Sequence, residues 1–261
     1  QKNEKIPRQP MPEQAADIRR RNFEEVPLGY DLEMATLEAK RCLQCKKPSC
    51  VEGCPVSVDI PGFIKFLAEG ELTQAIRKVW EKNALPAVCG RVCPQESQCE
   101  GRCILAKKGE AVAIGNLERF VADHARLHGD GTLPPKLKPS GKKVAVVGGG
   151  PAGLSCACTA AERGHAVTLF DASDRIGCQF NMAKRVPGKE EFYETLKYFS
   201  TRLERAGVEL KLGAQVGAAD LEDFDEVVLA TGVLPRTPAI PGIDHPKALS
   251  YIDVLQGDAA V

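Results

Sequence analysis

The sequence of 261 residues predicts an α-helical, cysteine-rich domain followed by an α/β domain built on a parallel sheet. Eight of the eleven cysteines fall between Cys42 and Cys103, in a part of the chain where apolar residues recur with helical spacing. After residue 141, short apolar runs alternate with helical segments, as strands and crossover helices do. We therefore expect a helical domain over residues 1–131, a linker over 132–141 and an α/β domain over 142–261.

Three segments of the first half have helical periodicity. Residues 31–41 place apolar side chains on one face and run directly into Cys42. Residues 61–82 predict two short helices separated at Gly70. Residues 114–128 predict a longer helix. Its apolar stripe consists of Ile114, Leu117, Val121 and Ala125.

A change of pattern marks the second half. The stretch GDGTLPPKLKPSG, residues 129–141, is rich in Gly and Pro and lacks an apolar period, which is typical of a linker. Beyond it, a helix follows the first strand and a second long helix covers residues 189–206. The predicted strands are residues 143–147, 166–170, 208–212 and 226–230.

Composition excludes several classes of protein. Lys plus Arg and Asp plus Glu each number 35, so nothing indicates a nucleic-acid-binding protein. No run of eighteen apolar residues occurs, and no charged-then-apolar leader precedes the first domain, so neither a membrane span nor a signal peptide is predicted. We expect a cytoplasmic protein.

The clustered cysteines form two groups of four. The first follows the pattern C-x2-C-x4-C-x3-C-P, and the second lies in CGRVCPQESQCEGRC. Short spacings let three thiolates of one loop bind one face of an iron–sulfur cubane, while the last thiolate, held by the proline, can bind a different cluster. The groups are Cys42, Cys45, Cys50 and Cys54, and Cys89, Cys93, Cys99 and Cys103.

Zinc sites and disulfides are the alternatives. Two four-thiolate zinc sites would also use eight cysteines, but zinc ribbons usually pair two C-x2-C motifs, and only one pair here has that spacing. A secreted disulfide scaffold fits poorly, because the chain is large and the number of cysteines is odd. The spacing favours iron–sulfur clusters.

A family resemblance joins these motifs. The segment RRRNFEEVPLGYDLEMATLEAKRCLQCKKPSCVEGCPVSVDIPGFI, with CGRVCPQESQCEGRC and AIGNLERF after it, resembles the small subunit of NADPH-dependent glutamate synthase. The module is also similar to the N-terminal domain of dihydropyrimidine dehydrogenase and to the large subunit of NADH-dependent ferredoxin–NADP oxidoreductase. The likeness covers nearly all of residues 11–128 and implies two [4Fe–4S] clusters.

The resemblance also implies which residues bind each cluster. One cluster would be held by Cys42, Cys45, Cys50 and Cys103. The other would be held by Cys54, Cys93, Cys99 and Glu118. The simpler interpretation of Glu118 is a solvated helix residue, although it lies on the face of the apolar stripe. Cys89 is then a packed thiol, and the i,i+4 pair His124 and His128 is interpreted as structural.

The second half contains a glycine-rich turn between a strand and a helix, Gly148-x-Gly150-x-x-Gly153. Asp171 ends the next predicted strand, eighteen residues after Gly153. The glycines let the backbone approach a pyrophosphate at the helix N-terminus, and the carboxylate would accept hydrogen bonds from ribose hydroxyls. This arrangement predicts a Rossmann-like dinucleotide site.

The dinucleotide is identified by a second resemblance. GGGPAGL, DASDRIGCQFNMAKRVPGKEEFYETLKYF and EVVLATGVLPRTPAIPGI are similar to the flavin domain of old-yellow-enzyme-like 2,4-dienoyl-CoA reductases and of trimethylamine dehydrogenase. The likeness runs from about Lys142 to the last residue and implies bound FAD. The implied FAD contacts are Gly148, Gly150, Pro151, Ala152, Gly153, Asp171, Gln179, Thr231 and Gly232.

Cys178 departs from this pattern, because most such relatives have Gly there. A side chain at that position would crowd the isoalloxazine ring. A redox thiol beside the flavin is a second interpretation, but no partner exists at C-x2-C spacing. Cys156 and Cys158 are interpreted as small core residues.

The relatives insert a second Rossmann unit for NAD(P)H after the strand that leads into the ATG motif, residues 230–232 of this sequence. This sequence has no second GxGxxG motif and no closing Gly-Asp segment. We therefore expect an incomplete FAD domain, NAD(P)H binding by a domain outside this sequence, and inefficient oxidation of NAD(P)H by this chain alone.

The function expected from these features is electron transfer in an NAD(P)H-dependent oxidoreductase, between FAD and two [4Fe–4S] clusters, with no catalytic residue of its own assigned. The expected partner is a catalytic large subunit, as in glutamate synthase, or another redox subunit. One alternative is a component of an enoyl- or pyrimidine-type reductase, which would need a barrel domain. The other is a non-catalytic cluster-bearing module of a larger redox complex.

Overall fold

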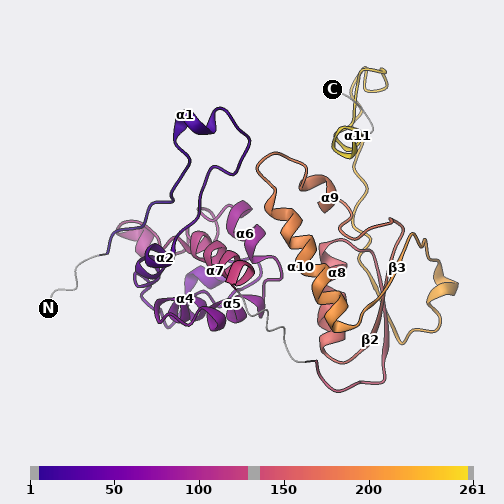
Figure 1. Cartoon of the computed structure of the whole chain (residues 1–261), viewed down its shortest axis with the longest axis horizontal. Helices are drawn as coiled ribbons and strands as arrows, with labels where there is room; N and C mark the ends of the chain where they lie inside the picture. The colour runs from indigo at the N-terminus through magenta and orange to yellow at the C-terminus, as the bar shows by residue number, and fades with distance from the viewer. Residues whose placement is uncertain (1–5, 129–135, 258–261) are drawn as a thin grey trace. The chain divides into compact units, whose positions relative to one another are not determined.

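The computed structural model describes residues 6–128 and 136–257. They belong to two compact units, Gln1–Thr132 and Leu133–Val261 (Figure 1). The first unit is helical and the second is α/β, so the predicted fold class is confirmed. Of the predicted linker, residues 132–135 lie outside the described residues, and residues 136–141 contain no helix or strand.

The first unit consists of short helices joined by loops. The predicted helical segments are present, with Gly70 in a left-handed conformation between the middle pair. The sequence analysis missed the shorter helices, because four to seven residues show too little apolar periodicity. The helices are α1 (Ala16–Arg19), α2 (Leu32–Ala39), α3 (Ser49–Glu52), α4 (Ile60–Ala68), α5 (Leu72–Trp80), α6 (Pro86–Val92), the 3-10 helix η1 (Ile104–Lys107) and α7 (Ile114–His128).

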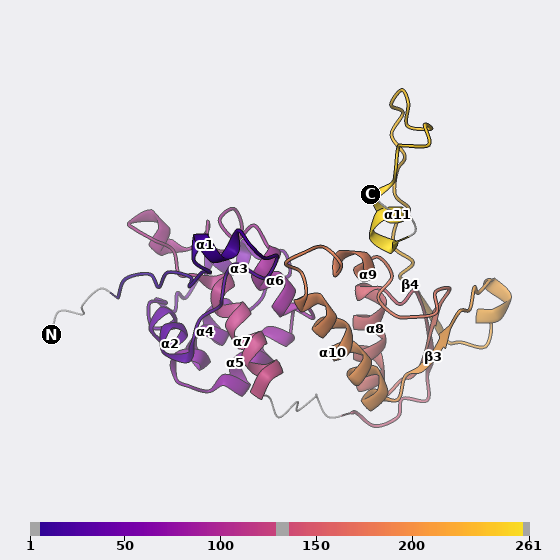
Figure 2. The same cartoon turned by 45° about the horizontal axis from the view of Figure 1, so that its top comes forward.

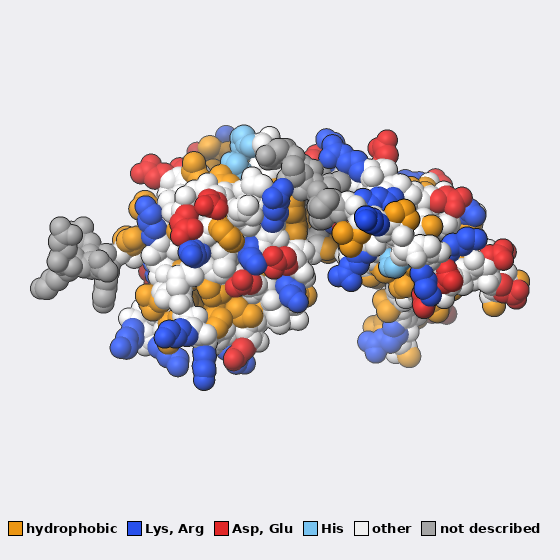
Figure 3. Space-filling view, turned by 90° about the horizontal axis from the view of Figure 1, so that it is seen from below, with side chains coloured by type: hydrophobic (Ala, Val, Ile, Leu, Met, Phe, Trp, Pro, Cys, Tyr) orange, Lys and Arg blue, Asp and Glu red, His pale blue; other side chains and the backbone are white. Residues whose placement is uncertain are grey.

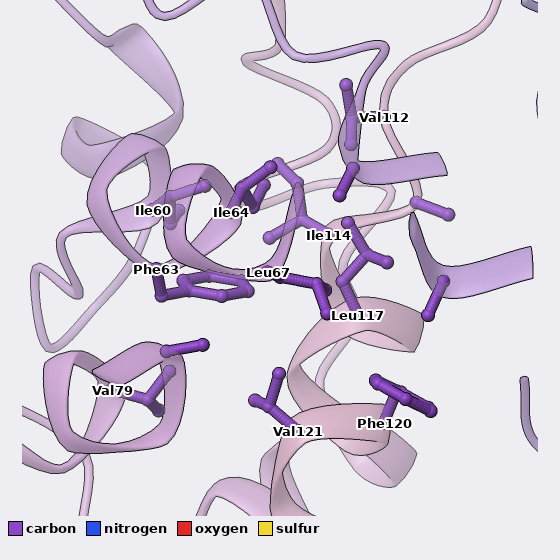
Figure 4. Close-up of a cluster of buried hydrophobic side chains, with 14 of the residues drawn as sticks. Ile60, Phe63, Ile64, Leu67, Val79, Val112, Ile114, Leu117, Phe120 and Val121 are labelled. Carbon is purple, nitrogen blue, oxygen red and sulfur yellow. The ribbon is translucent and has the colours of Figure 1, made fainter. Parts of the chain in front are cut away.

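Helix α7 lies at the centre of the apolar core of this unit (Figure 4). Its Leu117 and Val121 face Ile64 and Leu67 of α4 and Val79 of α5. All five side chains are buried, and burial of each stabilises the fold by about 1.5–3 kcal/mol. The core therefore fixes which residues of α7 point inward and which point toward the cysteine loops.

Two glycines let the cysteine-bearing helix α6 approach α7 closely. A Cβ atom added to Gly90 of α6 would lie 2.7 Å from the backbone nitrogen of Arg119 on α7. A Cβ atom on Gly115 of α7 would overlap the side chain of Gln95, which follows α6. Position 90 requires glycine for this contact because the clash would be with backbone atoms, whereas the flexible side chain of Gln95 can move away from position 115.

A buried carboxylate ties α2 to the segment that leads into α7. The Glu38 side chain is fully buried and accepts hydrogen bonds from the backbone nitrogens of Gln9, at 2.7 Å, and Ala113, at 2.8 Å. It also pairs with Arg41, which donates to the carbonyl oxygens of Glu110 and Ala111. The end of α2 and the end of the second cysteine loop are thereby joined.

The second unit is a four-stranded parallel sheet in the order β3-β2-β1-β4. Helices α8 and α10 lie on the same face of the sheet in both views (Figures 1 and 2). Each predicted strand is confirmed to within one residue at either end. The elements are β1 (Lys143–Val147), α8 (Pro151–Glu162), β2 (Ala166–Asp171), α9 (Phe180–Ala183), α10 (Glu191–Ala206), β3 (Glu209–Leu212), the 3-10 helix η2 (Ala218–Leu221), β4 (Glu226–Leu229) and α11 (Tyr251–Gln256).

One face of the molecule shows where charged side chains gather (Figure 3). On the face shown in Figure 3, acidic and basic side chains are interspersed on the C-terminal unit, whereas basic side chains gather along one edge of the N-terminal unit. Among the described residues, no helix has both the length and the apolar composition that crossing a bilayer requires.

We expect Glu38→Ala to lower the free energy of unfolding of the N-terminal unit by about 3–5 kcal/mol, because Arg41 and the backbone N–H groups of Gln9 and Ala113 lose their acceptor. Trp80 is the only tryptophan and lies in this unit, so urea titration of its emission reports the effect. The control is Glu33→Ala, an exposed residue of the same helix, for which we expect less than about 1 kcal/mol. Equal midpoints for the two variants would contradict this account of the buried carboxylate.

Candidate functional site

Four thiols from three segments of the N-terminal unit converge on one pocket. Cys42 and Cys45 follow α2, Cys50 lies on α3, and Cys103 directly precedes η1. Apolar residues complete the wall and limit the access of water to the sulfur atoms. These lining residues include Leu43, Pro48, Ile60, Ile64, Ile104, Val112 and Ile114.

The charge balance of this pocket favours a cationic occupant. Burial raises the pKa of the Cys42 thiol, and proximity to Cys103 and Cys45 raises it further. Burial likewise raises the pKa of Cys50 to about 11, with smaller contributions from Cys103 and Cys42. Four thiolates in one apolar pocket repel one another, so they are stable together only beside a positively charged centre.

A second group of ligating side chains surrounds Glu118 of α7. Burial is the main cause that raises the pKa of Cys93, and it raises the pKa of Cys99 to about 12. The nearby carboxylate of Glu118 and the thiol of Cys54 raise both pKa values further. Cys93 ends α6, Cys99 lies in the following loop, and Cys54 comes from the first cysteine group. The structure thus brings side chains of both sequence groups together here.

Glu118 is partly buried, not freely solvated as its simpler interpretation would require. Burial raises the pKa of its carboxyl group to about 7. Its Oε1 accepts a hydrogen bond of 2.6 Å from Nδ2 of Asn83. The structure therefore places this carboxylate near the thiols of Cys93 and Cys99.

Sequence reasoning missed Asn83. Its Oδ1 accepts from the backbone nitrogen of Leu85 at 2.9 Å and from the Cys89 thiol at 3.7 Å. The hydrogen bond to Leu85 is local and is of the kind that an Asn forms in a turn before a helix. Nothing in the sequence indicates the contact with Glu118, which is 35 positions away. Burial raises the pKa of Cys89 to about 12, so this thiol stays protonated at neutral pH.

All eleven cysteines lie within the described ranges, and all are free thiols. Between residues 6 and 128 and between 136 and 257, no three His, Cys, Asp or Glu side chains are grouped tightly enough to hold a single metal ion. A cubane is larger than one ion, and its ligands do not need to meet at a point. His124 and His128 stack with ring centroids 4.6 Å apart, as a packed pair at the end of α7.

The glycine turn of the second unit connects β1 to α8. Gly148 has φ of +114°, and a Cβ atom there would clash with the carbonyl of Ala230 after β4. A Cβ atom on Gly153 would clash with the carbonyl of Gly148. Gly150 is the N-cap of α8 without a side-chain cap, and Pro151 and Ala152 follow it, so the first N–H groups of the helix face the turn. A helix N-terminus with exposed N–H groups binds a phosphate favourably.

Asp171, at the end of β2, lies beside this turn. Its Oδ2 accepts from the backbone nitrogen of Gly149 and from the Cys178 thiol, and its Oδ1 accepts from the nitrogen of Ser173 at 2.7 Å. Burial alone would raise the pKa of Asp171, but hydrogen bonds from Cys178, Gly149 and Ser173 outweigh it and lower the pKa. The carboxylate therefore stays ionised.

The remaining predicted FAD contacts come from two neighbouring segments. Gly177 donates a backbone hydrogen bond of 2.7 Å to the carbonyl of Gly149, which places the segment before α9 against the turn. Gln179 donates through Nε2 to the carbonyl of Val233, 2.8 Å away, just after the ATG motif. Thr231 and Gly232 are exposed beside it.

Cys178 adopts an unusual backbone conformation, with φ of +46°. Its sulfur lies 3.7 Å from the position that a Cβ atom on Gly150 would occupy, so it does flank the turn. Burial, and then the bond to Asp171, raises the pKa of the Cys178 thiol to about 11, which disfavours a reactive thiolate. Cys158 is fully buried and Cys156 partly buried, in agreement with packing roles.

Known families match both units. Residues 19–130 match the family described as dihydropyrimidine dehydrogenase domain II, 4Fe-4S cluster. Residues 142–258 match the family described as pyridine nucleotide-disulphide oxidoreductase. The cysteine loops and α7 lie inside the first match, and the glycine turn and Asp171 lie inside the second.

Individual relatives extend across both units. The small chain of glutamate synthase [NADPH] from Escherichia coli is 36% identical over 226 residues, which are 85% of this chain and 48% of the relative. Its counterpart from Azospirillum brasilense is 38% identical over 246 residues, 91% of this chain and 50% of the relative. The chain therefore spans about half the length of these curated relatives.

Among solved structures, a complex of 2-naphthoyl-CoA reductase with 2-naphthoyl-CoA aligns with a TM-score of 0.49 and 27% identity, over 80% of this chain and 28% of that one.

The two family matches together account for most of the sequence. The chain therefore joins a domain that matches the 4Fe-4S family of the dihydropyrimidine dehydrogenase type to one that matches the pyridine nucleotide-disulphide oxidoreductase family, and it is similar to the small chain of NADPH-dependent glutamate synthase.

Proposed function

We propose that this chain passes electrons between FAD and two [4Fe–4S] clusters, and from there to a redox partner. The observation that supports this most is the convergence of thiols from separate loops into two groups within one helical unit. In the proposed assignment, one cluster is held by Cys42, Cys45, Cys50 and Cys103. The other is held by Cys54, Cys93, Cys99 and Glu118.

The residues present suit these cofactors. A bound flavin accepts a hydride and releases single electrons, which iron–sulfur clusters carry onward. The N-terminus of α8 and the glycine turn would bind the pyrophosphate, and Asp171 would orient the ribose. In the first unit the apolar wall with Ile60, Ile64 and Ile114 limits the access of water to the thiols.

The partner that we propose is a catalytic large subunit of the glutamate synthase type. Its support is the similarity to two small chains of that enzyme, each over more than four fifths of this chain. A pyrimidine-reducing partner is the second candidate, supported by the family description of residues 19–130. We propose the reducing cytoplasm as the compartment, because eleven free thiols suit it.

Metal analysis tests the proposed cluster sites. Anaerobically purified chain should contain about eight iron and eight sulfide per molecule, with the broad visible absorbance of clusters. Cys42→Ala should lose about half of both, because one four-ligand site is broken. Cys158→Ala is the matched control, a buried thiol of the other unit that should leave the iron content unchanged. Zinc in place of iron in the unaltered chain would refute the proposal.

The raised pKa of Glu118 predicts a pH dependence for chain stripped of metal by a chelator. The carboxyl group ionises at about pH 7 when folded and near 4.3 when unfolded, so ionisation favours unfolding. The contribution of Glu118 to stability should therefore be greatest below about pH 4.5 and fall as the pH rises to about 7, by up to about 3 kcal/mol. Urea midpoints measured from Trp80 emission give the curve.

Glu118→Gln should remove this part of the pH dependence, since the amide does not ionise. Glu33→Gln, an exposed position, should retain it. If Glu118→Gln and the unaltered stripped chain follow the same curve between pH 4.5 and 7, the carboxyl group is not buried as described.

For the flavin site, we expect Gly153→Ala to weaken FAD binding by at least about tenfold, or about 1.4 kcal/mol. The added methyl group clashes with the carbonyl of Gly148, and the backbone of the turn cannot move away without opening the pyrophosphate site. Gly217→Ala is the control in the same unit, because a methyl group there meets no atom closer than 3.9 Å. Titration of FAD fluorescence measures both, and equal affinities would contradict the role of the turn.

A further inference from the structure

We propose that Asn83 is a positioning residue that aims the Glu118 carboxylate at the thiols of Cys54, Cys93 and Cys99 and holds Cys89 out of the ligand set. The inference rests on the proposed function, because it concerns one of the two proposed cluster sites. It assigns a role to a residue that is itself no ligand.

The orientation of the Asn83 side chain is fixed by its surroundings. Its Oδ1 faces a backbone donor, the nitrogen of Leu85, at 2.9 Å, which an amide nitrogen could not replace. Nδ2 must therefore face Glu118, where it donates to Oε1 at 2.6 Å. Asn83 is only 6% exposed, so water does not compete for these bonds.

This bond divides the two oxygen atoms of Glu118 between two tasks. Oε1 is occupied by the amide of Asn83, whereas no described protein donor lies on Oε2. A carboxylate that is anchored through one oxygen presents the other in a fixed direction, which is how outer-shell partners orient metal ligands. Without the anchor, the flexible side chain of Glu118 would lose this direction.

The second contact of Asn83 explains why Cys89 stands apart. Cys89 lies within α6 and Cys93 directly follows its last residue, four positions later, so the two side chains lie on the same side of the helix. Cys89 is thus close enough to compete with Glu118 as the fourth ligand. Its thiol instead donates to Oδ1 of Asn83 at 3.7 Å, which turns the sulfur toward the asparagine. One side chain therefore presents Glu118 and restrains Cys89.

Asn83→Asp separates this role from a merely structural one. The new carboxylate can still accept from Leu85 and Cys89, but it offers Glu118 an oxygen atom in place of a donor. We expect the full chain to keep the first cluster and lose the second, so that iron and sulfide fall to about half. The electron paramagnetic resonance spectrum of the reduced chain should then show a single cluster without coupling to a neighbour. A purely structural role predicts an unchanged spectrum.

A reciprocal pair provides rescue. In Asn83→Asp with Glu118→Gln, the amide of residue 118 can donate to the carboxylate of residue 83 and leave its own oxygen for iron, so the hydrogen bond returns with reversed polarity. We expect iron, sulfide and the two-cluster spectrum to recover to the level of Glu118→Gln alone. Asn116→Asp on α7 is the matched control; Asn116 bonds to Tyr30 and should tolerate the change without loss of iron.

The possible results are distinct. Full iron and an unchanged spectrum in Asn83→Asp would overturn the positioning role, as would a double variant that stays as depleted as Asn83→Asp. Either result leaves the proposed function intact when the unaltered chain holds two clusters. An unaltered chain that binds zinc or no iron would overturn the proposed function and this inference with it.

Discussion

The burial of ionisable groups is the constraint on which the N-terminal unit depends. The thiols lie on or next to four short helices and are gathered into two groups. Glu118 lies in the second group. Burial raises the pKa of Cys50, Cys99 and Glu118, so their charged, ligating forms are costly without a cation. Binding of a positively charged cluster offsets that cost and joins distant loops at the same time.

The rest of this unit is arranged to hold those groups in place before any cofactor contributes. The apolar residues of α4, α5 and α7 fix the rotation of α7, and hence the direction of Glu118. Gly90 and Gly115 allow α6 to approach it, and Glu38 joins α2 to the segment before α7. Preformed ligand positions reduce the conformational entropy that cofactor binding must overcome.

Local sequence patterns predicted the long elements and left out the contacts between them. Helix α7 and the strands have strong periodicity, and the glycine turn needs a residue without a side chain, so each is evident from neighbouring residues. The helices α1 and α3 are too short to show a period. Asn83 was missed because its partner Glu118 is distant in the sequence, and the assignment of cysteines across loops came from a family resemblance and not from spacing.

Asp171 shows how hydrogen bonds of the second unit limit what the proposed dinucleotide site can accept. Its oxygen atoms accept from the backbone nitrogens of Gly149 and Ser173, from the Cys178 thiol and from the side chain of Ser173. A carboxylate offers about four lone-pair sites, so a ribose hydroxyl would have to replace one of these donors. The backbone donors also hold the turn and the end of β2, whereas the thiol is the weakest donor of the set. We therefore expect a bound ribose to displace the Cys178 thiol and to leave the backbone of the site unchanged.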